Sequence, residues 1–146
     1  MKLGNEDSPL SRFALLSDIG RMIDTEMNDC CEELKIQSGA RRVLSCLGKG
    51  DGLSQLDIVR ATRLKAPTIS LIVQKMEHDG LITRKTDDMD MRMTRVYLTE
   101  LGKNREKRIA ECIAETEADA LVGFSEEEKK TLSALLSRIY ANLEDR

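Results

Sequence analysis

The apolar and polar positions between residues 53 and 80 predict two short helices joined by a tight connection. Ser54 and Asp57 have the spacing of a capping box at the start of the first helix, which is expected to end near Thr62. The second helix has Pro67 in its first turn and ends at Asp79-Gly80. Its apolar positions follow the i, i+3, i+4, i+7 spacing of one buried face, at Ile69, Ile72, Val73 and Met76. This arrangement is typical of a helix-turn-helix.

A β-hairpin is predicted directly after these helices. Residues 81–84 are expected to form a short strand, residues 85–91 a polar tip, and residues 94–99, which alternate with a period of two, the return strand. A further short helix is predicted before the two helices of the helix-turn-helix. It buries Val43, Leu44 and Leu47 and ends in the glycine-rich residues 48–52. The predicted fold class is therefore mainly α with a small β-wing.

Longer helices are predicted on both sides of this region. One opens at Ser8-Pro9, where serine is a good cap, and its apolar positions recur at spacings of three and four up to Leu34. A second is capped by Thr99 and runs to about residue 122. The last begins at a capping box formed by Ser125 and Glu128.

The formal net charge of −3 is unevenly distributed along the chain. Residues 41–108 contain 15 Lys and Arg against 9 Asp and Glu, whereas the remaining residues contain 8 against 17. A basic middle between acidic ends suits a protein with one surface that faces an anion, although chance segregation of surface charge gives the same numbers. Aromatic residues make up only 3% of the chain, which argues against binding single strands by base stacking.

The long helices carry apolar stripes that none of them can bury on itself. The stripes either pack on one another within one chain or join two copies. We favour a homodimer, because a block built from the acidic ends would lie away from a polyanion. The residues expected in this interface are Phe13, Leu16, Ile23, Ile113, Leu132, Leu136, Ile139 and Leu143.

Several classes of protein are excluded or disfavoured by the same sequence. No apolar run approaches the length of a membrane span, and the first residues have no signal-peptide pattern, so we expect a cytoplasmic protein. His78 is the only histidine and has no nucleophile beside it, so neither an enzyme, a metal site nor a cofactor is expected. The four cysteines form no C-x-x-C pair and are interpreted as reduced thiols: Cys30, Cys31, Cys46 and Cys112.

The polar face of the second short helix is the candidate binding surface. Its serine, threonine and glutamine side chains can bond base edges or phosphates, and its lysine can neutralise a phosphate. Leu71, expected to be exposed, could contact a thymine methyl group. The alternative is an ordinary solvated face. The residues are Pro67, Thr68, Ser70, Leu71, Gln74 and Lys75.

At this point the sequence resembles the MarR family of winged helix-turn-helix transcriptional regulators. The resemblance is carried, in order along the chain, by Leu53-Ser54-Gln55, Pro67-Thr68-Ile69-Ser70, residues 78–84 (HDGLITR), Asp90-Met91-Arg92 and residues 96–102 (VYLTELG). It implies a homodimer that reads a pseudo-palindromic operator, with the helix of residues 66–78 in the major groove and the wing in the minor groove. It also implies that Arg92, held by Asp90, probes the minor groove, and that a small-molecule effector or a redox signal controls a repressor.

Under this interpretation the chain is one MarR-type domain, with the winged helix-turn-helix in residues 36–102 and the dimerisation region in residues 8–35 and 103–146. The expected DNA contacts on the recognition helix are the face just described together with Lys65. Those on the wing are Arg84, Lys85, Asp90, Arg92 and Arg95, and those to the DNA backbone are Ser54 and Arg63.

The sequence departs from the family pattern in two places. Leu71 stands where the family often has a polar or basic residue, and Met89 and Met91 stand in a wing that is often richer in arginine. The cysteines are better explained as small buried hydrophobes than as sensors, because nothing local would lower a thiol pKa. Two alternatives stay open: a winged-helix module that binds protein instead of DNA, and a DNA-binding protein with no ligand.

Overall fold

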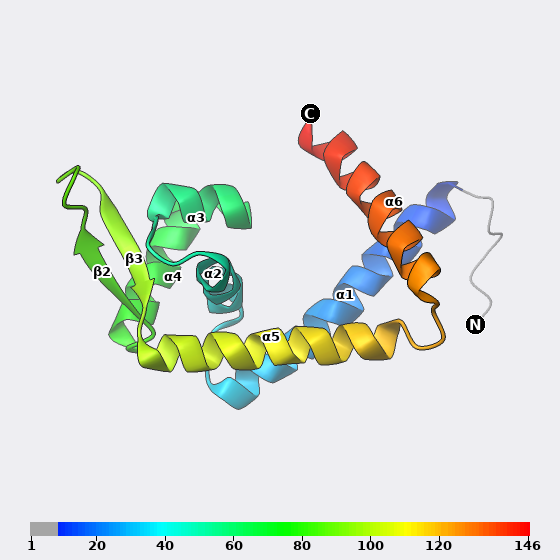
Figure 1. Ribbon diagram of the computed structural model, residues 1–146, viewed down its shortest axis with the longest axis horizontal. Coiled ribbons are helices and arrows are strands. Elements are labelled where there is room, and N and C mark those ends of the chain that lie inside the picture. The colour runs from blue at the N-terminus through cyan, green and yellow to red at the C-terminus, as the bar shows by residue number, and fades with distance from the viewer. Residues whose placement is uncertain (1–8) are drawn as a thin grey trace. The chain divides into compact units, whose positions relative to one another are not determined.

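The computed structural model describes residues 9–146, so the predicted cap Ser8 lies outside the described residues. The elements are α1 (Pro9–Leu34), α2 (Ser38–Lys49), β1 (Leu53–Ser54), α3 (Gln55–Thr62), α4 (Ala66–His78), β2 (Ile82–Thr86), β3 (Thr94–Leu98), α5 (Glu100–Ala120) and α6 (Glu126–Glu144). Figure 1 shows them along the chain. The chain divides into two compact units, which meet within α5, between Ile113 and Ala114.

The core of the first unit lies where α2, α3 and α4 meet (Figure 1). The apolar face expected for α4 is confirmed, since its four predicted positions are all buried. The inward positions predicted for α2 are confirmed in the same way. Ile58 of α3 is fully buried between them. Burying a branched side chain of this size contributes roughly 1.5–3 kcal/mol, so Ile58 stabilises the packing of α3 in this core.

A capping box starts α3, as the sequence predicts. The Asp57 backbone N–H donates to Ser54 Oγ at 3.1 Å, and the Ser54 N–H donates to Asp57 Oδ2 at 3.1 Å. The second bond lowers the pKa of the Asp57 carboxyl below its usual value, because it stabilises the charged form. At the other end, Arg63 adopts a left-handed conformation with φ 59°, which turns the chain into α4.

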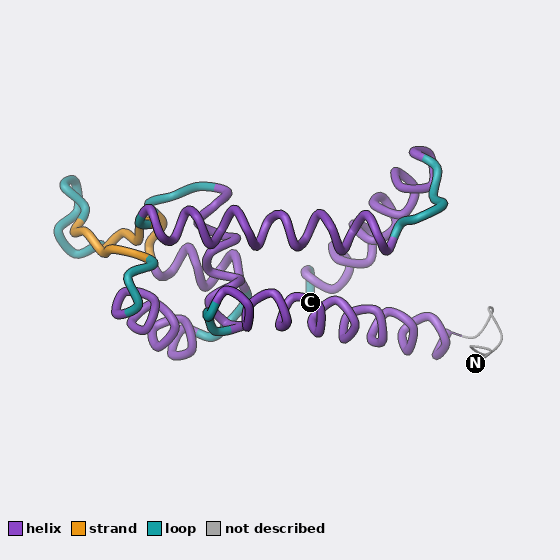
Figure 2. Tube along the Cα trace, turned by 90° about the horizontal axis from the view of Figure 1, so that it is seen from below, coloured by secondary structure: helices purple, strands orange, loops and turns teal. Residues whose placement is uncertain are grey.

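The sheet has three antiparallel strands in the order β1-β3-β2. Figure 2 shows its hairpin in orange, with the teal tip beyond it. The predicted hairpin is confirmed, with Ile82 paired with Leu98 and Thr86 paired with Thr94. The first strand is longer than predicted, because residues 85 and 86, expected in the tip, pair with β3. The strand β1 was not predicted, because a two-residue strand has no periodicity of its own. It exists because Leu53 pairs with Val96, more than forty residues further along the chain. This pairing ties the wing to the segment that precedes α3.

A second buried cluster joins the C-terminal part of α1 to α5. Met27 and Cys31 pack there with Ile109, and a disulfide links Cys30 to Cys112. The prediction that all four cysteines are reduced is therefore wrong for this pair. The cause is tertiary: the two helices bring the Cα atoms within 6.8 Å although the residues stand 82 positions apart.

The remaining cysteines, Cys31 and Cys46, are free thiols. Burial raises the pKa of each thiol, although Arg41 near Cys31 and Lys49 near Cys46 act in the opposite direction. Neither has the lowered pKa of a reactive cysteine.

The second unit comprises the end of α5 and the whole of α6. Gly123 adopts a positive φ of 85° between them, in the conformation that ends helices readily. The predicted capping box is confirmed: the Glu128 N–H donates to Ser125 Oγ at 3.1 Å and the Ser125 N–H donates to Glu128 Oε1 at 3.0 Å. No residue of α6 is buried. Its apolar stripe is therefore exposed or half-buried along its length.

None of the helices within residues 9–146 combines the length and apolar character that crossing a membrane requires.

Candidate nucleic-acid interface

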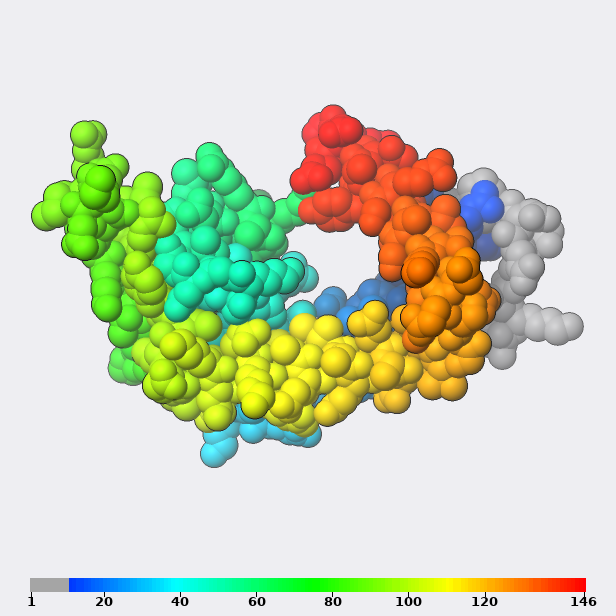
Figure 3. Space-filling view, viewed as in Figure 1, coloured from blue at the N-terminus to red at the C-terminus, as the bar shows by residue number. Residues whose placement is uncertain are grey.

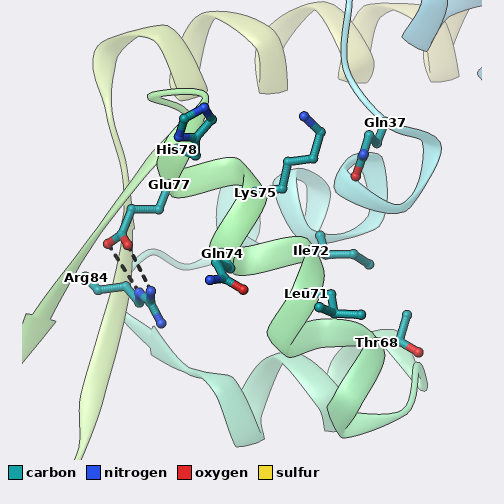
Figure 4. A pocket seen from close by; sticks show the side chains of 9 residues that line it. All are labelled: Gln37, Thr68, Leu71, Ile72, Gln74, Lys75, Glu77, His78 and Arg84. Carbon is teal, nitrogen blue, oxygen red and sulfur yellow. Dashed lines mark hydrogen bonds and ion pairs between the residues drawn. The ribbon is translucent and has the colours of Figure 1, made fainter.

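The exposed face of α4 borders an open groove of about 910 Å³ (Figure 4). Because Ile69, Ile72, Val73 and Met76 anchor the opposite face, the outward positions are fixed by the helical period. The groove is lined by Gln37, Thr68, Leu71, Ile72, Gln74, Lys75, Glu77, His78 and Arg84. The groove therefore brings together four of the seven residues predicted for the recognition helix. Of the other three, Pro67 and Ser70 are exposed on α4 but do not line the groove, and Lys65 is the exposed N-cap of α4.

The charged groups around this groove are paired with one another. Arg84 on β2 donates to both oxygens of Glu77, at 2.9 Å and 3.2 Å, and Figure 4 shows the two bonds. These bonds lower the pKa of the Glu77 carboxyl. Lys75 forms an ion pair with Asp79 at 3.4 Å, one turn further along α4. The centre of the groove is thus left to neutral side chains.

The tip of the wing is organised by two aspartates. The Asp87 carboxylate accepts bonds from the backbone N–H groups of Met89, at 2.7 Å, and Asp90, at 3.3 Å. Asp90 Oδ1 accepts the Arg92 N–H at 3.0 Å and lies 3.9 Å from Arg92 Nε. Asp90 thus holds the Arg92 backbone by the hydrogen bond, while the Arg92 side chain is 97% exposed and its guanidinium stays accessible. Figure 3 shows the tip projecting from the rest of its unit.

Arg95 was expected on the DNA-facing side of the wing, but its bonds point inward. Its Nε donates to Asp87 at 2.5 Å and its guanidinium also donates to the Gly52 carbonyl at 2.8 Å. Arg95 therefore fastens the wing tip to the loop before β1. This role of Asp87 was not predicted from the sequence, because Asp87 lies just beyond the end of β2 and the strand residue paired with Arg95 is Lys85.

The other predicted backbone and wing residues differ in accessibility. Ser54 is 9% exposed and uses its oxygen as the α3 cap, which leaves only its hydroxyl proton for a phosphate. Arg63 lies in the exposed turn between the helices of the helix-turn-helix. Lys85 lies over the ring of Tyr97, 5.4 Å from its centroid, in a cation–π contact.

The Asp87 carboxyl should titrate below its usual pKa, because the Arg95 guanidinium and two backbone N–H groups stabilise its charged form. The contribution of these bonds to folding is then present above about pH 4 and is lost as the pH falls through the lowered pKa. In ¹H–¹⁵N NMR spectra, the Met89 and Asp90 amide shifts should follow this titration, and Asp87→Asn should abolish it. Asp88→Asn is the matched control. A midpoint at or above the ordinary carboxyl pKa would contradict the assignment.

Comparisons with known proteins agree with this geometry. The family model described as MarR family matches residues 34–93. The chain is 29% identical over 138 residues to the HTH-type transcriptional regulator PecS of Dickeya dadantii, covering 92% of this chain and 83% of that protein. A MarR family regulator from Listeria monocytogenes, solved with a 26mer DNA, superposes with a TM-score of 0.85 at 25% identity, over 91% of this chain and 89% of its own. The structure of the regulator SlyA superposes with a TM-score of 0.84 at 26% identity, over 94% of this chain and 96% of its own.

The helix-turn-helix, the wing and the exposed face of α4 define a winged helix-turn-helix DNA-binding protein. The chain is similar to the MarR family of transcriptional regulators, both in the segment that the family model matches and in the solved structures. The resemblance predicted from the sequence is thereby confirmed, and so is the function as a DNA-binding regulator. The proteins that it resembles are regulators of transcription.

Proposed function

We propose that this regulator acts as a homodimeric repressor, which binds a pseudo-palindromic operator and releases it in response to a small-molecule effector. Such behaviour is typical of the family. The observation that carries the dimer is the set of apolar side chains left uncovered on α1 and α6. Phe13 is 63% exposed, and Ile23, Leu136, Ile139 and Leu143 are exposed as well. Large exposed apolar surfaces are rare on monomeric proteins and mark interaction sites.

The DNA contacts follow from the same proposal. In each protomer α4 enters the major groove, the wing with Arg92 reaches the minor groove, and Arg63 and Lys65 lie near phosphates. Two copies place two such surfaces on half-sites separated by about one helical turn of DNA. The dimer block would comprise residues 8–35 and 103–146, and the winged helix-turn-helix residues 36–102. The acidic ends of the chain would then face away from the DNA.

Selection of bound duplexes from a random library tests the DNA-binding part directly. The enriched sequence should contain an inverted repeat, and the affinity for it should fall linearly on a plot of log K against log salt concentration, because phosphate binding releases counterions. A protein-interaction module would enrich no sequence and would show no such slope. That result would refute operator binding.

Arg92→Ala is expected to weaken operator binding by about tenfold per half-site, the range of one specific groove contact. The arginine is almost fully exposed, so its guanidinium can reach a groove of the DNA. Lys130→Ala on α6, which removes a cation from the proposed dimer block, is the matched control and should bind normally. Fluorescence anisotropy with the selected duplex measures both, and equal affinity for wild type and Arg92→Ala would contradict the role of the wing.

Ile139→Asp is expected to raise the dimer dissociation constant by at least about tenfold, because each protomer would bury an unpaired carboxylate in an apolar interface. Sedimentation equilibrium should give twice the 16.4 kDa chain mass for wild type and a shift towards the single chain for the variant. Ala134→Asp, on the opposite face of α6, should leave the mass unchanged. A wild type that sediments as a single chain would overturn the proposed dimer.

A further inference from the structure

Leu71 is an apolar side chain in the middle of the polar face that α4 presents. It is 69% exposed, more than any other leucine or isoleucine among the described side chains. Pro67, Leu71, Gln74 and His78 stand at i, i+4, i+7 and i+11, so they form one stripe along the helix, opposite the buried face. In Figure 4, Leu71 borders the groove with Thr68 and Gln74 nearby. A leucine at this place contacts whatever α4 binds.

The chemistry around Leu71 is neutral. The sequence of α4, residues 66–78, contains no arginine, the residue that most often reads guanine through paired hydrogen bonds. Its lysine, Lys75, is paired with Asp79, and the nearby Arg84 is held by both oxygens of Glu77. The uncharged side chains that α4 presents between these ion pairs include Leu71 itself, Thr68, Ser70 and Gln74.

Base edges in the major groove offer a leucine one partner. Guanine, cytosine and adenine present hydrogen-bonding groups there, whereas thymine adds an apolar C5-methyl group. Contact between that methyl group and Leu71 removes apolar surface of both partners from water, which is favourable in proportion to the area. A cytosine or guanine at the same position would instead leave polar edges desolvated against the leucine without a partner.

We propose that Leu71 determines specificity by reading the methyl group of one thymine in each half-site. This inference rests on the proposed operator binding and adds the base that the centre of α4 selects. The recognised group is the C5-methyl of a pyrimidine, so 5-methylcytosine shares the chemistry, although thymine is the natural occupant of an unmodified operator.

Substituting deoxyuridine for single thymines of the selected operator tests the contact, since this change removes only the methyl group. For wild type, one thymine per half-site should give about a fourfold loss of affinity, the factor expected for one apolar carbon returned to water. Leu71→Ala should bind the thymine duplex more weakly and should bind the thymine and deoxyuridine duplexes equally. Unchanged circular dichroism and thermal unfolding would show that the exposed substitution leaves the fold intact.

Leu56→Ala is the matched control, since Leu56 is 57% exposed on α3 and does not line the groove. It should retain the wild-type ratio between the two duplexes. In a third duplex, 5-methylcytosine at the same position should bind wild type better than cytosine does, and Leu71→Ala should not distinguish them.

Two results would overturn the inference while leaving operator binding in place. In the first, replacing any single thymine by deoxyuridine leaves the affinity of wild type unchanged. In the second, Leu71→Ala keeps the wild-type ratio between its affinities for the thymine and deoxyuridine duplexes. If wild type enriches no sequence at all, operator binding itself fails and the inference fails with it.

Discussion

Reduction of the Cys30–Cys112 disulfide is expected to lower the free energy of unfolding by about 3–4 kcal/mol. The bond closes a loop of 82 positions, and a crosslink of that length strongly restricts the unfolded chain. It also fixes α1 against α5 at a small cluster, in which five described residues are buried, Met27, Cys30, Cys31, Ile109 and Cys112, with Leu34 and Ile36 partly buried against them. So small a cluster gives the helix pair little other stabilisation.

Urea unfolding followed by circular dichroism, with and without reductant at one fixed protein concentration, measures the effect. Thiol alkylation of the denatured chain should label two cysteines before reduction and four after it. Cys112→Ala should be insensitive to reductant. Cys46→Ala, which leaves the bond intact, should remain sensitive. Identical unfolding midpoints for oxidised and fully reduced protein would refute this prediction.

The disulfide also illustrates which features the sequence alone could not provide. Its partners lie on different helices, and no local spacing connects Cys30 with Cys112. The same holds for β1, which depends on the distant Val96, and for Arg95, whose partner is the carbonyl of Gly52. Each of these depends on a tertiary contact that becomes visible only when the chain is folded.

Local features were predicted well for the opposite reason. The capping boxes at Ser54 and Ser125 involve residues three apart, and the buried face of α4 follows directly from the helical period. The exposed face of α4 could be predicted because it is the complement of a strongly apolar one. The pairing of its charges could not, since Arg84 reaches Glu77 from a neighbouring strand. Because these charges are paired, neutral side chains, among them Leu71, form much of the groove lining.

Gly102→Ala is expected to destabilise the protein by about 3 kcal/mol, although alanine ordinarily favours a helix by up to about 1 kcal/mol over glycine. Gly102 is buried in the first turn of α5, and a Cβ atom there would collide with the backbone carbonyl oxygen of Leu81. That carbonyl already accepts the Thr99 N–H at 3.0 Å, while Thr99 Oγ1 donates to the Gly80 carbonyl at 2.6 Å. Alanine must push α5 away from the turn and break these bonds.

A second glycine-to-alanine substitution separates the steric effect from the effect of helix propensity. Gly48→Ala is the matched control, because Gly48 also lies in a helix but its added Cβ would meet the carboxylate end of Glu106, a flexible side chain that can turn aside. It should change the free energy of unfolding by less than about 1 kcal/mol. Because the turn at Gly80 connects α4 to the wing, Gly102→Ala should also weaken operator binding. A Gly102→Ala protein as stable as Gly48→Ala would show that the close approach of α5 to Leu81 is not needed for this fold.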